Sequence, residues 1–168
     1  MSGCEERLER LLLLAKPYLD RNEFGIGHTE RVLRIAKGKL KIPRGDEELV
    51  VASIILHDIG GSTVKDQYEK GPKIAADLLR QLDYSEAFVQ EVCEIIRTHH
   101  DRPDNPREAF KILFDADQLV RFSEEEFSHY ESEGIDWNLI INRMYFEETK
   151  RNAREALKTR KREKRAPD

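Results

Sequence analysis

Helical spacing of apolar residues runs through almost the whole 168-residue chain and limits its fold more than any other feature. Apolar side chains recur every three or four residues, as at Leu8, Leu12 and Leu19, whereas strand-type alternation is scarce. Residues 62–72 are expected to form a loop or a distorted turn. We predict an all-α, single-domain bundle of about seven to eight helices, at 3–19, 28–40, 47–59, 72–82, from 85 onward, 106–121, from 123 onward and 136–160.

The length and cysteine content restrict the class of protein further. A chain of this length can bury one sizeable core but not two. No apolar run approaches the roughly 18–20 residues of a membrane span, and the polar start "MSGCEERLER" does not resemble a secretion signal. Cys4 and Cys93 lack the spacing of a disulfide framework, so we expect a cytoplasmic protein with no membrane partner.

The net charge of −4 is unevenly distributed along the chain. Residues 150–168 carry nine Lys/Arg against three Asp/Glu, or +6, and the preceding residues carry −10. We therefore expect a domain over 1–150 followed by a basic helix end or tail over 151–168. The simpler interpretation of this tail is a solvated helix end, and the alternative is an arm for nucleic acid or an acidic partner. The tail has no aromatic residue to stack on bases, which argues against nucleic acid.

Polar side chains with metal-binding chemistry lie at the ends of apolar helices. His28, His57, His99 and His100 each lie near such an end, whereas His129 is expected to be an exposed surface histidine. Three aspartates, Asp58, Asp115 and Asp117, are similarly placed, two of them inside "KILFDADQLV". A buried carboxylate is costly unless it is paired or binds a cation. A lone aspartate of this kind is more often a cap or an ion-pair partner, but several gathered with histidines by a bundle favour a metal centre.

A centre of histidines and aspartates has a definite chemistry. Imidazole nitrogen and carboxylate oxygen together suit Mn, Fe, Co, Ni or Zn, and suit Mg less well. Two ligands of each kind leave coordination positions open to water. A bound divalent ion lowers the pKa of that water and attracts a phosphoryl oxygen, which is the chemistry of phosphate-ester hydrolysis.

The order of these residues resembles a known family. His28, the pair His57-Asp58 and finally Asp117 resemble the H…HD…D signature of the HD-domain superfamily of metal-dependent phosphohydrolases. The segments "GIGHTERVLRIA", "ASIILHDIGG" and "AFKILFDADQL" are similar to the helices that carry these ligands, and the resemblance covers about residues 22–122. It implies an HD-type bundle, one divalent transition metal held by these four residues, and a small phosphate ester, of nucleotide type, as substrate.

The resemblance also bears on other histidines and on Asp115. Family members with several metals have extra histidines between the HD pair and the last aspartate, and His99 and His100 in "RTHHDRP" resemble one such position. We expect one of them to hold a second metal or to act as an acid or base, with a plain surface loop as the alternative. The other usual histidine is replaced by the segment 69–71, "EKG", so we expect one tightly bound metal. Asp115 competes with Asp117 as the last ligand, or holds a ligand histidine in place.

Many relatives continue as "HDIGK", but this chain has Gly61 where they have lysine. Another cation would then bind the substrate phosphate. For each candidate phosphate-binding residue, an ordinary surface or salt-bridge residue is the alternative interpretation. The same alternative holds for Glu30 and Asp101 as candidate acids or bases. The phosphate candidates are Arg31, the best placed of them, and Lys65, Arg97 and Arg102.

Three functions are open from the sequence. The leading prediction is an HD-type phosphohydrolase, a phosphomonoesterase or phosphodiesterase. The second is a catalytically silent, metal-binding HD module that binds a ligand or partner. The third is a di-iron oxygenase, against which the missing histidine at 69–71 argues. The resemblance also allows a homodimer, although no surface stripe identifies an interface.

Overall fold

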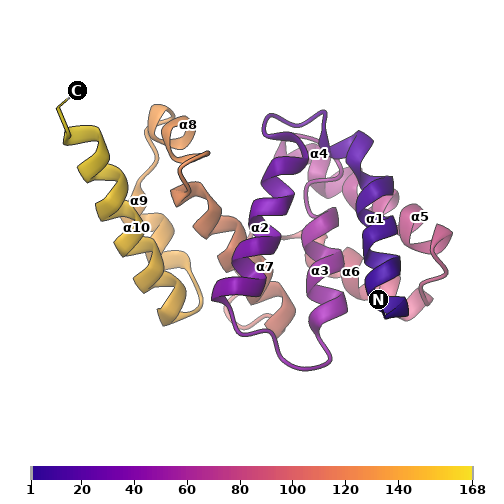
Figure 1. The fold of residues 1–168 in the computed structure, drawn as a ribbon. Helices are drawn as coiled ribbons and strands as arrows, with labels where there is room; N and C mark the ends of the chain where they lie inside the picture. The colour runs from indigo at the N-terminus through magenta and orange to yellow at the C-terminus, as the bar shows by residue number, and fades with distance from the viewer. Residues whose placement is uncertain (1, 168) are drawn as a thin grey trace.

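The regular structure of the computed structural model, which describes residues 2–167, is helical throughout, and the prediction of an all-α fold is confirmed (Figure 1). Ten α-helices and one 3₁₀ turn, η1, follow one another in this part of the chain. They are α1 (Gly3–Leu19), α2 (Gly25–Lys39), α3 (Glu47–Leu56), α4 (Val64–Glu69), α5 (Gly71–Gln81), α6 (Glu86–Arg97), α7 (Glu108–Leu119), η1 (Val120–Phe122), α8 (Phe127–Ser132), α9 (Trp137–Arg143) and α10 (Glu147–Arg165).

Helix α3 is the centre of the main core. Every residue from Leu49 to Leu56 is buried, because this helix is apolar on all sides and packs against α1, α2, α6 and α7. The surrounding helices are amphipathic and turn their apolar faces toward it. The polar residues that follow Leu56 therefore emerge in the middle of the bundle, at the end of its most buried helix.

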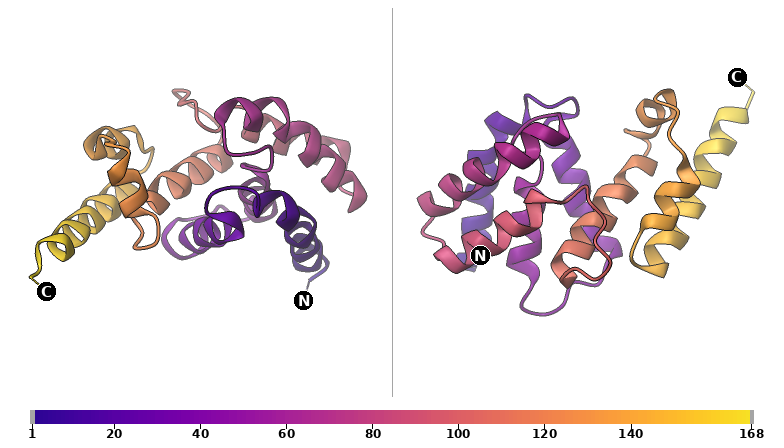
Figure 2. Two further views of the ribbon diagram at one scale, coloured as in Figure 1. Left: turned by 90° about the horizontal axis from the view of Figure 1, so that it is seen from above. Right: turned by 180° about the vertical axis from the view of Figure 1, so that it is seen from behind.

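The C-terminal helices build a second, smaller core against the end of α7. Phe127 and Trp137 stack there with ring centroids 4.5 Å apart, and Ala153 of α10 is buried beside them. Helices α1 and α10 lie at opposite ends of the molecule (Figures 1 and 2). The expected boundary between residues 150 and 151 falls inside α10, so the start of the basic segment belongs to this core; residue 168 lies outside the described residues.

Two helix predictions are wrong for identifiable reasons. The segment 62–72 contains α4, which begins where the Thr63 hydroxyl accepts the amide N–H of Asp66 at 3.1 Å. The single helix expected over 136–160 is divided into α9 and α10. It breaks because the buried carboxylate of Asp115 accepts the amide N–H groups of Tyr145 at 2.8 Å and Phe146 at 2.9 Å.

Smaller differences concern the ends of two helices. Helix α3 ends at Leu56 rather than at 59, and α8 begins at Phe127 rather than at 123. Cys4 and Cys93 are free thiols. Among the helices of residues 2–167, none has the length and apolar character needed to cross a bilayer.

Candidate metal centre

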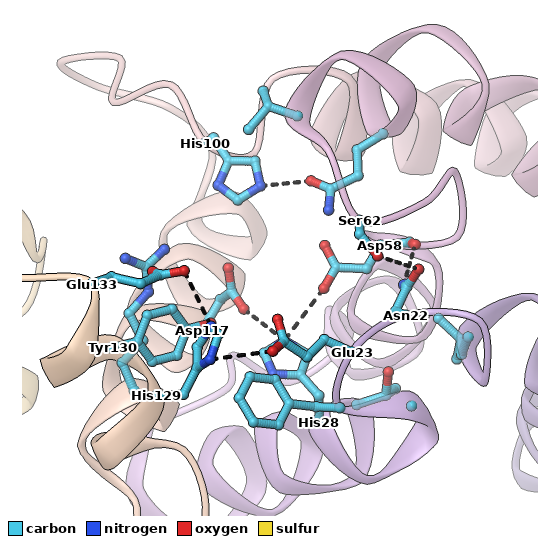
Figure 3. A pocket seen from close by; sticks show the side chains of 17 residues that line it. Asn22, Glu23, His28, Asp58, Ser62, His100, Asp117, His129, Tyr130 and Glu133 are labelled. Carbon is cyan, nitrogen blue, oxygen red and sulfur yellow. Dashed lines mark hydrogen bonds and ion pairs between the residues drawn. The ribbon is translucent and has the colours of Figure 1, made fainter. Parts of the chain in front are cut away.

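Three helices bring four ligand-type side chains to one point in the middle of the bundle. His28 lies in the first turn of α2, His57 and Asp58 directly follow α3, and Asp117 lies in the last turn of α7. One ligand atom from each residue lies within 4.8 Å of the other three. Figure 3 shows the side chains of His28, Asp58 and Asp117 pointing toward one another.

The imidazole nitrogens of this cluster face the carboxylate oxygens. The Nε2 atom of His28 lies 3.1 Å from Asp117 Oδ1 and 3.3 Å from Asp58 Oδ2. The Nε2 atom of His57 lies 3.2 Å from Asp58 Oδ2 and 3.3 Å from Asp117 Oδ1. Two nitrogens and two oxygens thus surround one position, as in a four-ligand metal site.

The other nitrogen of each ring sets its orientation. His57 donates from Nδ1 to the Ile54 carbonyl oxygen at 2.6 Å. His28 donates from Nδ1 to the Glu126 carboxylate, whose two oxygens lie at 3.0 and 3.1 Å. Because Nδ1 carries the donated proton in both rings, Nε2 is the atom available to a metal.

The hydrogen bonding of His57 tests whether a metal ion fits among these four residues. Its side chain is fully buried, and its Nε2 atom has no hydrogen-bond partner of adequate geometry, although two carboxylate oxygens lie close to it. A buried nitrogen left in this way is costly. A divalent cation among the four residues would bind that nitrogen and both carboxylates, so the residues present fit a transition metal.

The charges of the cluster are strongly coupled. Burial disfavours the protonated form of His57, but the carboxylates of Asp58 and Asp117 outweigh it and raise the pKa of His57 to about 10. The same carboxylates and Glu126 raise the pKa of His28, against the effect of burial. Burial would raise the pKa values of Asp58 and Asp117, yet the imidazoles hold both well below the usual range. Both aspartates are therefore ionised at neutral pH and ready to bind a cation.

A second group of ligand-type residues adjoins the first. Asp58, His99 and His100 also lie within mutual ligand distance, so Asp58 belongs to both groups. His99 repeats the arrangement of His57: it follows a helix, its Nδ1 donates to the Ile96 carbonyl oxygen at 2.7 Å, and its unpartnered Nε2 lies 3.5 Å from Asp58 Oδ1. His100 donates to Gln67 Oε1 at 2.6 Å. His99 is buried and His100 half-buried, so neither lies on an exposed surface loop.

Asp115 does not have the role expected for it. Its buried carboxylate accepts the backbone N–H groups at the start of α10 and holds no ligand histidine. Burial raises the pKa of Asp115. Successive helical residues point about 100° apart, so Asp115 and Asp117 face different neighbours, and only Asp117 reaches the cluster. Asp115 therefore connects α7 to the start of α10 through two hydrogen bonds.

Glu126 is the residue that orients His28, and the sequence did not reveal it. It is completely buried and accepts from Arg31 as well as from His28, with Arg31 Nε at 2.9 Å and Nη2 at 2.8 Å. It is the last of three consecutive glutamates, and nothing in the sequence distinguishes it from the exposed Glu124 and Glu125. Only the tertiary structure shows that one of the three is buried beside His28 while the other two are exposed.

A cavity of about 360 Å³ opens onto the cluster. The loop before α2, the start of α4, His100, η1 and α8 supply its walls. His129, expected to be a plain surface residue, lines this cavity: its Nδ1 lies 3.2 Å from Glu23 and its Nε2 lies 3.2 Å from Glu133 (Figure 3).

The cations expected to bind phosphate do not line this cavity. Arg31 is held by Glu126, and Lys65 is exposed on α4. Arg97 borders a separate groove between α5 and α6, and Arg102 donates to the Arg143 carbonyl oxygen at 2.8 Å. The acid/base candidates, which are exposed and also lie off the cavity, are Glu30 and Asp101.

Comparison with known proteins identifies the family. The HD domain family model matches residues 25–122, which is more than half of the chain. The chain therefore belongs to the HD domain family, and the resemblance inferred from the sequence is confirmed. Searches of curated proteins and of solved structures gave no match. The matched range ends at η1, so Glu126 and the α8 wall of the cavity lie outside it.

Proposed function

We propose that this protein is a metal-dependent phosphohydrolase that acts on a nucleotide or a related phosphate ester. One observation carries the proposal: His28, His57, Asp58 and Asp117 of an HD domain meet at one point, with an unsatisfied buried nitrogen aimed at two ionised carboxylates. The HD domain is typical of metal-dependent phosphohydrolases, and the cavity beside the cluster is within the size range of small-molecule sites.

A divalent cation held by these four residues would supply an activated water and positive charge for the phosphoryl group. The chain's own groups supply orientation and charge. Glu126 and the Ile54 carbonyl oxygen hold the two histidines in the tautomer that leaves Nε2 free. In the reaction, the water oxygen bonds to phosphorus, the ester P–O bond breaks, and the alcohol leaves with a proton.

The neutral ring of His100 is suited to bind a metal rather than to supply a proton to a leaving group. Burial, with His99 beside it, lowers the pKa of His100 to about 4, so its ring is neutral at pH 7. This favours the metal-ligand role expected for it over that of an acid. The group of Asp58, His99 and His100 makes a second ion the alternative to the single tightly bound metal that we predict.

The proposal is tested by metal analysis and hydrolysis assays on the wild type, Asp58→Ala and a control, Asp104→Ala, which changes an exposed loop aspartate. The substrate panel contains nucleoside monophosphates and triphosphates, cyclic dinucleotides and a generic phosphodiester. We expect about one transition metal per chain and hydrolysis of a panel member by the wild type and the control. Asp58→Ala should lose both.

Two outcomes would contradict the proposal. Metal binding without hydrolysis of any panel member would favour the binding module, or the oxygenase if two irons bind per chain. No metal in the wild type, even after reconstitution with Mn, Fe, Co, Ni and Zn, would refute the metal centre itself.

A further inference from the structure

One arginine that the sequence did not single out lies in the wall of the cavity. Among the described residues that line it, Arg121 alone is a lysine or arginine, whereas four are acidic: Glu23, Asp58, Asp117 and Glu133. The basic residues expected to bind phosphate lie elsewhere. An anionic substrate that enters this cavity meets one fixed cation of the chain.

The position of Arg121 relates it directly to the metal cluster. Helix α7 passes without interruption into η1, and Arg121 follows Asp117 by four residues, or about one helical turn. Residues at this spacing lie on the same side of a helix, about 5–6 Å apart at Cβ. The guanidinium and the metal-binding carboxylate therefore reach the same cavity from one rigid element.

The guanidinium is held by an aromatic ring instead of a carboxylate. Its Cζ atom lies 4.9 Å from the centre of the Tyr130 ring, which also lines the cavity. No carboxylate within residues 2–167 lies at ion-pair distance from it. Stacking on a ring face orients the planar group and leaves its N–H edge available for a ligand.

The neighbouring charged side chains already have partners in the protein. Arg31 is neutralised by the buried Glu126. Glu23 and Glu133, from opposite walls, are both within 3.2 Å of His129, which bridges them. Arg121 is thus the cation of this cavity that has a fixed orientation and, within residues 2–167, no anionic partner.

We propose that Arg121 is the phosphate-binding residue of this site and that it selects phosphomonoesters; this rests on the proposed phosphohydrolase function. The guanidinium fork binds two oxygens of one phosphate group. A terminal phosphate has three non-bridging oxygens, so it can engage the fork and still leave one for the ion held by the ligand cluster. A phosphodiester has two. The cavity volume, near the low end of small-molecule sites, fits a ligand of mononucleotide size.

The test uses the Mn²⁺-loaded full-length protein and inorganic phosphate as the probe. Wild type, Arg121→Gln, Arg121→Lys and a matched control, Arg97→Gln, are compared by calorimetric phosphate titration, metal analysis and thermal unfolding. We expect metal content to be the same in all four. Phosphate affinity should fall about 10- to 100-fold in Arg121→Gln, less in Arg121→Lys, and remain unchanged in Arg97→Gln. Arg121→Lys keeps a positive charge at the position should Arg121→Gln fold poorly.

The results separate this inference from the proposed function. Phosphate binding that depends on Arg121, in a protein that hydrolyses no ester, supports the binding role and refutes the hydrolase. If the wild type hydrolyses an ester and Arg121→Gln binds phosphate within twofold of wild type, the role of Arg121 is refuted but the proposed hydrolase function is not. Absence of phosphate binding in the wild type, or faster hydrolysis of a phosphodiester than of the matching monoester, also overturns the inference.

Discussion

Replacement of Glu126 by glutamine should weaken both the metal centre and the fold. The side chain keeps its shape, but it loses the charge that faces His28 and Arg31. Glu126 has no exposed surface, and Arg31 retains only 16% exposure of its side chain, so water cannot replace the lost charge. The variant therefore leaves a largely buried guanidinium without its counter-ion.

The size of each effect follows from these contacts. Removing one partner of a buried ion pair costs about 3–5 kcal/mol, and we expect the lower end, about 3 kcal/mol, because glutamine keeps one acceptor oxygen. In a domain of this length such a loss lowers Tm by roughly 6–12 °C. Changing the group that orients a metal-binding histidine costs about 10- to 100-fold in metal affinity, which is about 1.4–2.7 kcal/mol.

The two effects are measured separately. Urea unfolding of the metal-free protein reports the fold, and competition with a chelator reports the metal dissociation constant. Glu48→Gln is the matched control, since it removes the carboxylate of another glutamate–arginine pair, with Arg7 at 3.0 Å, that is partly exposed and lies at the opposite end of α3 from the cluster. It should cost at most about 1 kcal/mol and leave metal affinity unchanged. A Glu126→Gln protein that is destabilised but binds metal within twofold of wild type would refute the orienting role of Glu126.

Three further perturbations test other parts of the structure. Asp115→Asn should lower the free energy of unfolding by about 2 kcal/mol, because one charged hydrogen bond to the start of α10 is lost, while a changed metal affinity would show that Asp115 contacts the centre after all. Gly60→Ala should destabilise the protein by about 1–3 kcal/mol, since a Cβ there would lie 2.4 Å from the Asp66 carbonyl oxygen. Gly38→Ala is the control: its Cβ would meet nothing within 4 Å, so in urea unfolding it should stabilise the protein by about 0.5–1 kcal/mol. The third perturbation is a change of pH in chelator-treated protein. As pH falls from 6.5 toward about 4, His100 takes up a proton in the unfolded chain but not in the folded one, because its pKa is lowered in the fold, so the free energy of unfolding should decrease across that range. The decrease should be smaller in His100→Asn, and an equal decrease would rule out this contribution.

Much of the helical layout could be predicted from local sequence. Helix α1 spans the predicted residues 3–19, and α3 was expected to be central because it is apolar on every side. The missed helix α4 begins at a local cap, Thr63, but the wrong prediction of one helix over 136–160 has a distant cause. The break between α9 and α10 depends on Asp115, thirty positions earlier, whose buried carboxylate takes the N–H groups that a continuous helix would use. No local pattern around 144–146 contains that information.

For the site, the sequence by itself determined the family and the candidate ligands, because His28, the His57-Asp58 pair and Asp117 occur in a recognisable order within helices of recognisable periodicity. Tertiary structure alone decided what surrounds them. It placed Glu126 behind His28, turned Asp115 away toward α10, and put Arg121 in the cavity instead of the four cations expected there. The physical reason is that ligand type is a property of the residue, whereas partnership depends on which helices meet. Burial and counter-charge, set by that packing, determine whether an identical side chain binds a metal, fastens a helix or remains free for a substrate.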